Sequence, residues 1–220
     1  PLLAVLSRSC PSAPRRLRYN EVVMTLQPFR SNEQRGAIVQ ESGPDGRTIL
    51  RYPGPDDREE FLTLRAASAD FHRPWEPAPA AGIDPYSAEA FANYLKGSRH
   101  EARERLLLCR RDSGTILGSF NLSEICRGPL QSAYLGYWIG TEFTQQGYMT
   151  EGIRLILRHA FVTLGLHRVE ANIRPENEPS LALVRRAGFR REGFSPGYLK
   201  IDGAWRDHER WAMLANEFEG

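Results

Sequence analysis

The stretch from Tyr134 to Phe189 constrains the fold of this chain more than any other part of it. It reads as a strand (YLGYWIG), a glycine-containing loop (TEFTQQGYMTEG), a helix (IRLILRHAFVTLG), a second strand (LHRVEANIRP) and a second helix start (ENEPSLALVRRAGF). A loop that enters a helix through Gly147 leaves backbone N–H groups free at the positive end of the helix dipole. Such a helix start is a natural seat for a phosphate group.

Periodicity supports both central elements of this stretch. The helix carries apolar residues at the spacing of one buried face, namely Ile153, Ile156, Leu157, Ala160 and Leu164. Gly165 then ends the helix, as a glycine after the last turn commonly does. The following strand alternates, so that one face carries Val169, Ala171 and Ile173, and the other carries Arg168, Glu170, Asn172 and Arg174.

The rest of the chain supplies further strands and helices. Residues 47–53 predict a strand, and helices begin near Pro55 and Pro85, where proline suits a first turn. Turn residues at 112–114 and at Asp202-Gly203 predict two hairpins. The resulting order, β-α-α-β-β-β-α-β-α-β-β, predicts a mixed sheet with helices on both faces.

Composition limits the number of domains and the classes of partner. At 220 residues, the chain fits one domain, residues 47–220, after a flexible tail or leader, residues 1–46, rich in Pro, Ser, Gly and Arg. Residues 1–20 contain four arginines and no acidic residue, which suits either an organellar transit peptide or a leader upstream of Met24. The net charge of +2 is too small to predict direct nucleic-acid binding.

The cysteines and the hydropathy pattern exclude disulfide-rich, zinc-binding and membrane-spanning proteins. Three cysteines without C-x-x-C spacing predict neither a disulfide framework nor a zinc site, and we expect no metal. They favour a reducing compartment, hence a cytoplasmic protein. No run approaches the roughly 18 apolar residues that a membrane-spanning helix needs, so we expect no membrane partner.

Five blocks occur in order along the chain: LGYWIG, QQGYMTEG, HRVEANIRPEN-x-x-S, LVRRAGF and IDGAWRDH. Together they resemble the GCN5-related N-acetyltransferase (GNAT) superfamily, especially its branch of ribosomal-protein N-terminal acetyltransferases, RimJ and RimL. The resemblance covers about residues 47–214. It implies an α/β (α+β) fold with a mostly antiparallel central sheet, helices on both faces and one splayed pair of strands.

The resemblance implies acetyl-CoA as the acyl donor, which agrees with the anion site predicted from the residues. Backbone N–H groups where the loop becomes a helix are expected to bind its pyrophosphate, at Gln145, Gln146, Gly147, Tyr148, Met149 and Thr150. The family pattern has Gln or Arg where this chain has Thr144. The pantetheine arm is expected between strands that end near Ile139 and Arg174. Asn177 and Ser180 match the family's N-x-x-S, and Arg186 matches a basic position near the nucleotide.

Catalysis needs an acceptor amine in its neutral form. Glu170 is the predicted base because it lies on the polar face of the central strand, and Ser180 is the predicted proton donor to the sulfur. Base or acid positions of relatives hold Asn172, Val184 and Leu199 here, so they do not carry over. A peptide α-amine, with a pKa near 7.7–8.0, needs only a modest base, whereas a lysine-like amine near 10.4 needs a stronger one.

The acceptor is predicted to be the N-terminus of a ribosomal or other protein or peptide, bound by Trp75, Tyr198, Trp205 and Asp207. His208 is interpreted as a strand residue rather than a catalyst. Transfer is expected to be direct, because no cysteine lies in the five blocks. Two alternatives stay open: a small-amine acceptor such as an antibiotic, polyamine or amino-acid derivative, and a non-catalytic acyl-CoA-binding module. A monomer or a homodimer fits equally well.

Overall fold

The computed structural model describes residues 38–41, 46–78 and 82–220. All of them belong to one compact unit, residues 32–220. The expectations for residues 1–37, including the leader, lie outside the described residues. The predicted boundary at residue 46 stays a prediction, although a short strand, β1 (Ile38–Glu41), forms just before it and pairs with the next strand.

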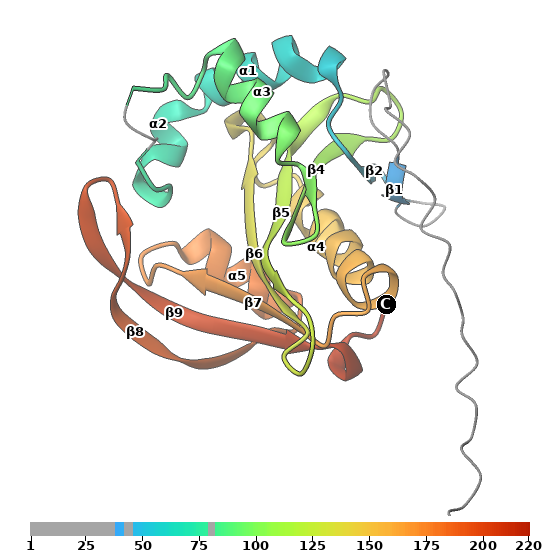
Figure 1. The fold of residues 1–220 in the computed structure, drawn as a ribbon, viewed down its shortest axis with the longest axis vertical. Coiled ribbons are helices and arrows are strands. Elements are labelled where there is room, and N and C mark those ends of the chain that lie inside the picture. Colours follow the sequence, from blue (N-terminus) through green and yellow to red (C-terminus); the bar gives the residue numbers. More distant parts are fainter. Residues whose placement is uncertain (1–37, 42–45, 79–81) are drawn as a thin grey trace, which may run out of the picture. The chain divides into compact units, whose positions relative to one another are not determined.

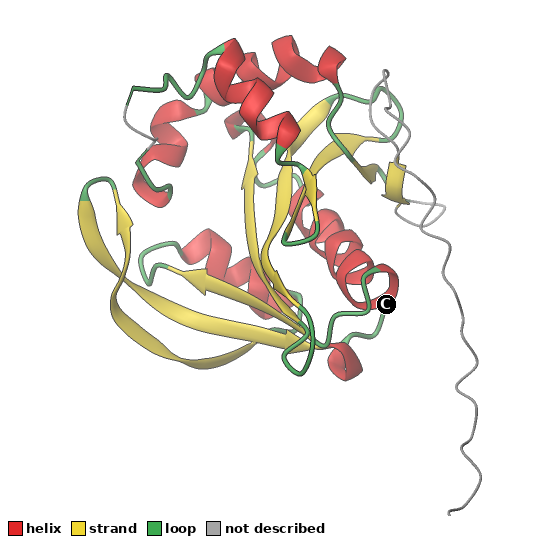
Figure 2. Cartoon of the chain, viewed as in Figure 1, coloured by secondary structure: helices red, strands yellow, loops and turns green. Residues whose placement is uncertain are grey.

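The strands form a single mixed sheet, drawn as yellow arrows in Figure 2. Their order across the sheet is β1-β2-β4-β5-β6-β7-β9-β8, with the short β3 paired to β4. All neighbours are antiparallel except β6 and β7. The remaining strands are β2 (Thr48–Arg51), β3 (Arg99–His100), β4 (Arg103–Arg110), β5 (Ile116–Cys126), β6 (Ser132–Ile139), β7 (Arg168–Ile173), β8 (Arg190–Ile201) and β9 (Ala204–Leu214).

The helices occur in the predicted order, with the first helical region divided into α1 and α2. They are α1 (Arg58–Ala67), α2 (Ala69–His72), α3 (Ala88–Lys96), α4 (Tyr148–Arg158) and α5 (Glu178–Arg186). Short 3-10 turns lie at Pro55–Asp57, Arg73–Trp75, Thr141–Phe143 and Ala215–Glu217, and a π-helical turn at His159–Thr163 extends α4. No helix in the described part of the chain is long and apolar enough to cross a membrane.

Strand β4 shows why helices cover both faces of the sheet. Leu106 and Leu108 are completely buried in the cluster that also contains the apolar faces of α4 and α5. Leu107 and Cys109 alternate with them and are completely buried on the other face, against residues of α1 and α3. The predicted fold class is therefore confirmed, and both sequence-predicted hairpins form, β4–β5 and β8–β9.

The parallel pair β6 and β7 separates along its length, as Figure 1 shows. The two strands pair only at Ser132–Tyr134 and Arg168–Glu170, and their remaining residues have no partner across the gap. Strands β7, β8 and β9 stay paired with one another as they turn away from β6. The splayed pair expected from the resemblance is thus present, and it opens the sheet in its middle.

Candidate active site

A pocket lies where β6 and β7 separate. Its walls come from both strands, from the start of α5 and from two distant segments. The lining residues are Trp75, Leu135, Gly136, Tyr137, Asn172, Ile173, Arg174, Asn177, Ser180 and His208. The separation of the strands therefore brings together segments that lie up to 133 positions apart in the sequence.

The β6 wall presents backbone groups to the gap. Gly140 N–H donates to the carbonyl of Leu117 on β5, and the antiparallel ladder alternates from there. The N–H and C=O groups of Leu135, Tyr137 and Ile139 consequently point away from β5 and towards the side of β7. An extended ligand with amide groups can pair with such an edge as an added strand does.

One of these edge groups is already bound within the protein. His72, which is buried, places its Nε2 2.8 Å from the carbonyl oxygen of Ile139. Its Nδ1 lies 2.9 Å from an Arg65 guanidinium nitrogen, which can only donate. Burial lowers the pKa of His72, and the Arg65 charge adds to this effect, so the ring is neutral with its proton on Nε2. This contact holds the end of β6 in place.

The loop before α4 has the geometry that the glycine pattern predicted. Gly147 is in the left-handed region, with a φ of 83°, directly before the first residue of the helix. Gln145 is also left-handed, with a φ of 60°. Gln145, Gln146 and Gly147 are exposed, whereas the Tyr148 side chain is buried, leaving its backbone N–H as its contribution to an anion site. A φ-positive glycine at a helix start is the arrangement that directs successive N–H groups at an anion.

Arg47 supports this loop, a role that the sequence did not predict. Its guanidinium donates to Glu151 Oε1 at 2.8 Å and to the Gln146 carbonyl at 3.0 Å, and it lies over the Tyr148 ring. Partial burial acts to raise the pKa of Glu151, but the hydrogen bonds and charge of Arg47 outweigh it and lower that pKa. No local pattern predicts the contact, because the two residues are 104 positions apart.

The start of α5 forms the floor of the pocket. Asn177 is the predicted N-cap, and its side-chain oxygen accepts from Ser180 N–H at 3.2 Å. The Tyr137 hydroxyl donates to the Ser180 carbonyl at 3.5 Å, and burial raises the pKa of Tyr137 to about 12. Both Asn177 and Ser180 line the pocket, as their expected donor contacts require. Arg186 is exposed in the last turn of the same helix, and Val184 is completely buried in the core.

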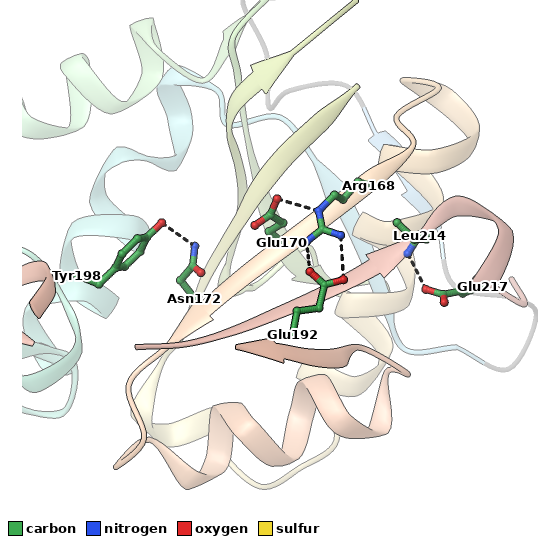
Figure 3. Close-up of polar contacts among 7 residues, drawn as sticks. All are labelled: Arg168, Glu170, Asn172, Glu192, Tyr198, Leu214 and Glu217. Atoms are coloured by element: carbon green, nitrogen blue, oxygen red, sulfur yellow. Dashed lines mark hydrogen bonds and ion pairs between the residues drawn. The ribbon is translucent and has the colours of Figure 1, made fainter. Parts of the chain in front are cut away.

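Glu170 lies just outside the pocket. It sits on β7 opposite Tyr134, where β6 and β7 still pair, and it is not a lining residue. Its carboxylate accepts from Arg168 Nε at 2.8 Å, and Arg168 also pairs with Glu192 on β8, as Figure 3 shows. The next residue on the same face, Asn172, does line the pocket. The predicted polar face is therefore real, but its Glu170 end is occupied by an ion pair.

The residues predicted to bind the acceptor divide into two sets. Trp75 lines the pocket, and the Arg174 guanidinium lies 5.3 Å from the centre of its ring. The Tyr198 hydroxyl accepts from Asn172 Nδ2 at 3.3 Å, a contact drawn in Figure 3. Trp205 is 68% exposed, Asp207 accepts from Gly197 N–H within the hairpin, and neither lines the pocket.

His208 lines the pocket, although the sequence indicated only a strand residue at this position. It is only 3% exposed, and it lies in β9 two positions after Arg206. Side chains alternate along a strand, so His208 points to the face opposite Trp205 and Asp207. Nothing local distinguishes it from its neighbours. Its place at the pocket depends on the pairing of β9 with β7, which cannot be read from the sequence.

The cysteines and potential metal ligands add no chemistry to this pocket. Cys109 is completely buried, and burial raises the pKa of its thiol to about 12, so it is not a nucleophile. Cys126 is exposed and is not a lining residue. Among the residues that the structure describes, no group of three or more His, Cys, Asp or Glu side chains is arranged to hold a metal ion.

A splayed parallel pair, a glycine-started helix beside it and a capped helix below it define an acyl-CoA-dependent transferase of the GNAT type. The family model described as an acetyltransferase (GNAT) domain matches residues 47–190. The chain belongs to this family and is an N-acetyltransferase, so the resemblance found in the sequence is confirmed.

Two relatives match over nearly their whole length. The ribosomal protein uS5 alanine N-acetyltransferase of Escherichia coli (strain K12) is 32% identical over 192 residues, which are 86% of this chain and 96% of that enzyme. The structure of Mycobacterium smegmatis RimJ in complex with CoA-disulfide has a TM-score of 0.75 and 32% identity, covering 83% of this chain and 89% of that one.

A third match shows the fold alone. The spermidine N-acetyltransferase from Vibrio cholerae, solved in complex with CoA and spermine, has a TM-score of 0.67 at 22% identity. It covers 79% of this chain and 99% of that one. Enzymes with different acceptors thus share this sheet and these helices, and the acceptor must be argued from the pocket itself.

Proposed function

We propose that this enzyme transfers an acetyl group from acetyl-CoA to the α-amine of a protein or peptide, in particular the N-terminus of a ribosomal protein. The observation that carries the proposal is its similarity to the uS5 alanine enzyme over 96% of that enzyme. A ribosomal acceptor would place the reaction in the cytoplasm. A monomer and a homodimer both remain compatible with it.

The residues present fit acetyl-CoA as the donor. The N–H groups of Gln145, Gln146, Gly147, Tyr148, Met149 and Thr150 would bind the pyrophosphate at the start of α4. The outward backbone groups of β6, up to Ile139, would pair with the amides of the pantetheine arm. Asn177 and Ser180 would contact the arm near the sulfur, and exposed Arg186 would lie towards the nucleotide.

The contents of the pocket support a direct transfer. The neutral amine would attack the thioester carbon, a C–N bond would form, and the C–S bond would break. The nitrogen would lose its extra proton to a base or to solvent, and the sulfur would leave with the electron pair and take up a proton. We assign Ser180 as the proton donor to that sulfur, with the Tyr137 hydroxyl beside the same turn of α5. No cysteine lines the pocket among the described residues, which supports one step without an acetyl-cysteine intermediate.

The charge of the lining favours an α-amine over a polyamine. Arg174 is among the lining residues, and none of the described lining residues is Asp or Glu. Arg174 is paired with Glu176, whose Oε2 lies 3.2 Å from its Nε but which is not a lining residue, so a polycation would meet a guanidinium and no carboxylate in the lining. A peptide α-amine, whose pKa is about 8, is partly neutral near physiological pH and adds little positive charge.

The rival acceptor is a small amine. Its support is the shared fold of the Vibrio cholerae spermidine enzyme, which extends to 99% of that chain. The N-terminal and the polyamine hypotheses make opposite predictions about the charge of the pocket lining. A small polyamine substrate would require carboxylates at the pocket, contributed by segments outside the lining that the structure describes.

A panel of acceptors tests the proposal. Peptides with ribosomal-protein N-termini, beginning with alanine or serine, are incubated with acetyl-CoA beside spermidine, spermine and amino-acid derivatives, and products are identified by mass. We expect acetylation of peptide α-amines and weak or no acetylation of polyamines. Acetylation of small amines alone would overturn the acceptor proposal. Binding of CoA without turnover of any amine would instead indicate a non-catalytic module.

A further inference from the structure

His208 is placed and oriented as a base at the pocket. Its Nδ1 lies 3.0 Å from the carbonyl oxygen of Arg206, and a carbonyl can only accept, so the proton of a neutral ring is on Nδ1. That leaves Nε2 unprotonated, with its lone pair available. The side chain lines the pocket and is 3% exposed, so water competes little for that lone pair.

The groups around His208 keep its ring neutral. Burial lowers its pKa, and the positive charge of Arg174, directly after β7, lowers it further. The Arg206 carbonyl, Asp207 and Glu176 act in the opposite direction and are outweighed. From β8, the Tyr198 ring faces it at a centroid distance of 5.6 Å.

Besides the lone pair of His208 Nε2, the same face carries a second hydrogen-bond acceptor without a donor, on Asn172. Its Nδ2 donates to Tyr198, but its Oδ1 is buried and has no hydrogen-bond partner. Extending the β7–β9 register by one step sets His208 opposite Arg174, which is the next pair on the same face after Asn172 and Arg210. Diagonal neighbours of this kind lie about 7–8 Å apart, a span that a bound amine can bridge. A buried acceptor without a donor calls for a ligand N–H.

We propose that Asn172 Oδ1 orients the acceptor amine and that His208 Nε2 receives its proton. The inference rests on the proposed transfer to an amine. As the C–N bond forms, the nitrogen carries an extra proton, which passes to Nε2 and makes His208 an imidazolium. The thioester C–S bond breaks, and the sulfur takes the electron pair and a proton from Ser180 or solvent. His208 then returns its proton to solvent, and Ser180, where it was the donor, regains one from solvent. Glu170 then acts only through its ion pair with Arg168.

A measurement without any acceptor tests the state of the ring. Long-range proton–nitrogen spectra of protein labelled in histidine, with His208→Asn used to assign the signal, report which nitrogen is protonated. We expect an Nδ1-protonated neutral ring at about pH 7, and a titration midpoint below the roughly 6.5 of a free histidine. A ring protonated at Nε2, or charged at neutral pH, would overturn the proposal.

Kinetics with any acceptor that the wild-type enzyme acetylates, peptide or small amine, provide the second test. Asn at position 208 keeps a donor for the Arg206 carbonyl and removes Nε2. We expect His208→Asn to lower kcat/KM about 100-fold or more, while the Kd for acetyl-CoA changes less than about twofold. His167→Asn, an exposed histidine, is the matched control, and Glu170→Gln is the rival, with an expected loss below about threefold.

Chemical rescue separates a base from a structural residue. Added imidazole should restore part of the turnover of His208→Ala and none of that of Ser180→Ala. Nearly full activity in His208→Asn, or a large loss in Glu170→Gln alone, would overturn the assignment. If no offered amine is acetylated, the proposed function has failed, and the spectra still decide whether Nε2 of His208 is a free base.

Discussion

The donor and acceptor sides of the active site differ in what they are made of. The proposed donor side consists mainly of backbone: the loop into α4, the outward groups of β6 and the first turn of α5. The proposed acceptor side consists of side chains from four distant places, Trp75, Arg174, Tyr198 and His208. Backbone in a defined conformation suits a ligand shared by a whole family, whereas side chains vary with the acceptor.

This difference predicts opposite sensitivities. Changes in backbone conformation should damage donor binding, whereas changes in side-chain chemistry should damage acceptor use. Four experiments sharpen or break the distinction, and each of the first three compares two variants.

The largest effect on donor binding is expected from Gly147→Ala. A side chain at a φ of 83° is strained, and its Cβ would lie 3.3 Å from an Arg47 guanidinium nitrogen. Gly165 at the other end of the same helix has a φ of 63° with nothing within 4 Å of an added Cβ. Both variants should lose about 1 kcal/mol of stability. Calorimetric titration should show about tenfold weaker CoA binding for Gly147→Ala alone; equal affinities would contradict a backbone donor site.

Loss of the α5 cap should have the next largest effect. Asn177→Ala removes the acceptor of Ser180 N–H and should cost about 1 kcal/mol in chemical denaturation. Ser87→Ala removes the equivalent cap of α3, where Ser87 Oγ accepts from Ala90 N–H at 3.1 Å. We expect about fivefold weaker CoA binding for Asn177→Ala. If Ser87→Ala weakens CoA equally, the effect is one of global stability.

Removal of a pocket tryptophan should affect the acceptor and spare the donor. Trp75→Ala removes the ring beside Arg174, a contact of about 0.5–1 kcal/mol, so the acceptor KM should rise about two- to fivefold. Trp205→Ala tests the sequence-predicted contact at the exposed face of the hairpin and should raise KM less. Steady-state kinetics at saturating acetyl-CoA decide between them, and a larger effect at Trp205 would move the acceptor site to the outer face.

The smallest effect concerns pH and the end of β6. Because the folded-state pKa of His72 is lowered, the unfolded chain binds more protons below about pH 6.5, and stability falls as the pH drops from there towards the folded-state pKa. The slope from this one group is at most about 1.4 kcal/mol per pH unit. Denaturation between pH 7 and pH 5 should show a shallower slope in His72→Gln; the same slope would exclude His72 as its cause.

The sequence predicted the local features of the site well. The glycine before α4, the Asn177 cap and the alternation along β7 are each set by neighbouring residues, and all three occur in the structure. It did not show which residue of the polar β7 face meets the pocket. That depends on where β6 and β7 separate, after Tyr134 and Glu170, which is a property of strand pairing.

His208 and Glu170 show the same limit from two sides. Glu170 is a carboxylate on the polar face of β7, as a base requires. It lies in the last β6–β7 pair before the gap, however, and forms an ion pair with Arg168 there. His208 lies in a motif that was recognised, yet its access to the pocket follows from the β7–β9 register and the direction of its side chain. Contacts between residues so far apart in the sequence leave no periodic pattern from which they could be predicted.

The sequence by itself determined the family, the order of strands and helices, and the glycine loop before α4, because turn chemistry, capping and hydrophobic periodicity act over a few residues. Only the tertiary structure decided which side chains line the pocket. Trp75, Asn172 and His208 meet because two strands of one sheet separate while a third keeps its pairing. Contacts across that gap depend on three-dimensional register, and no run of neighbouring residues encodes it.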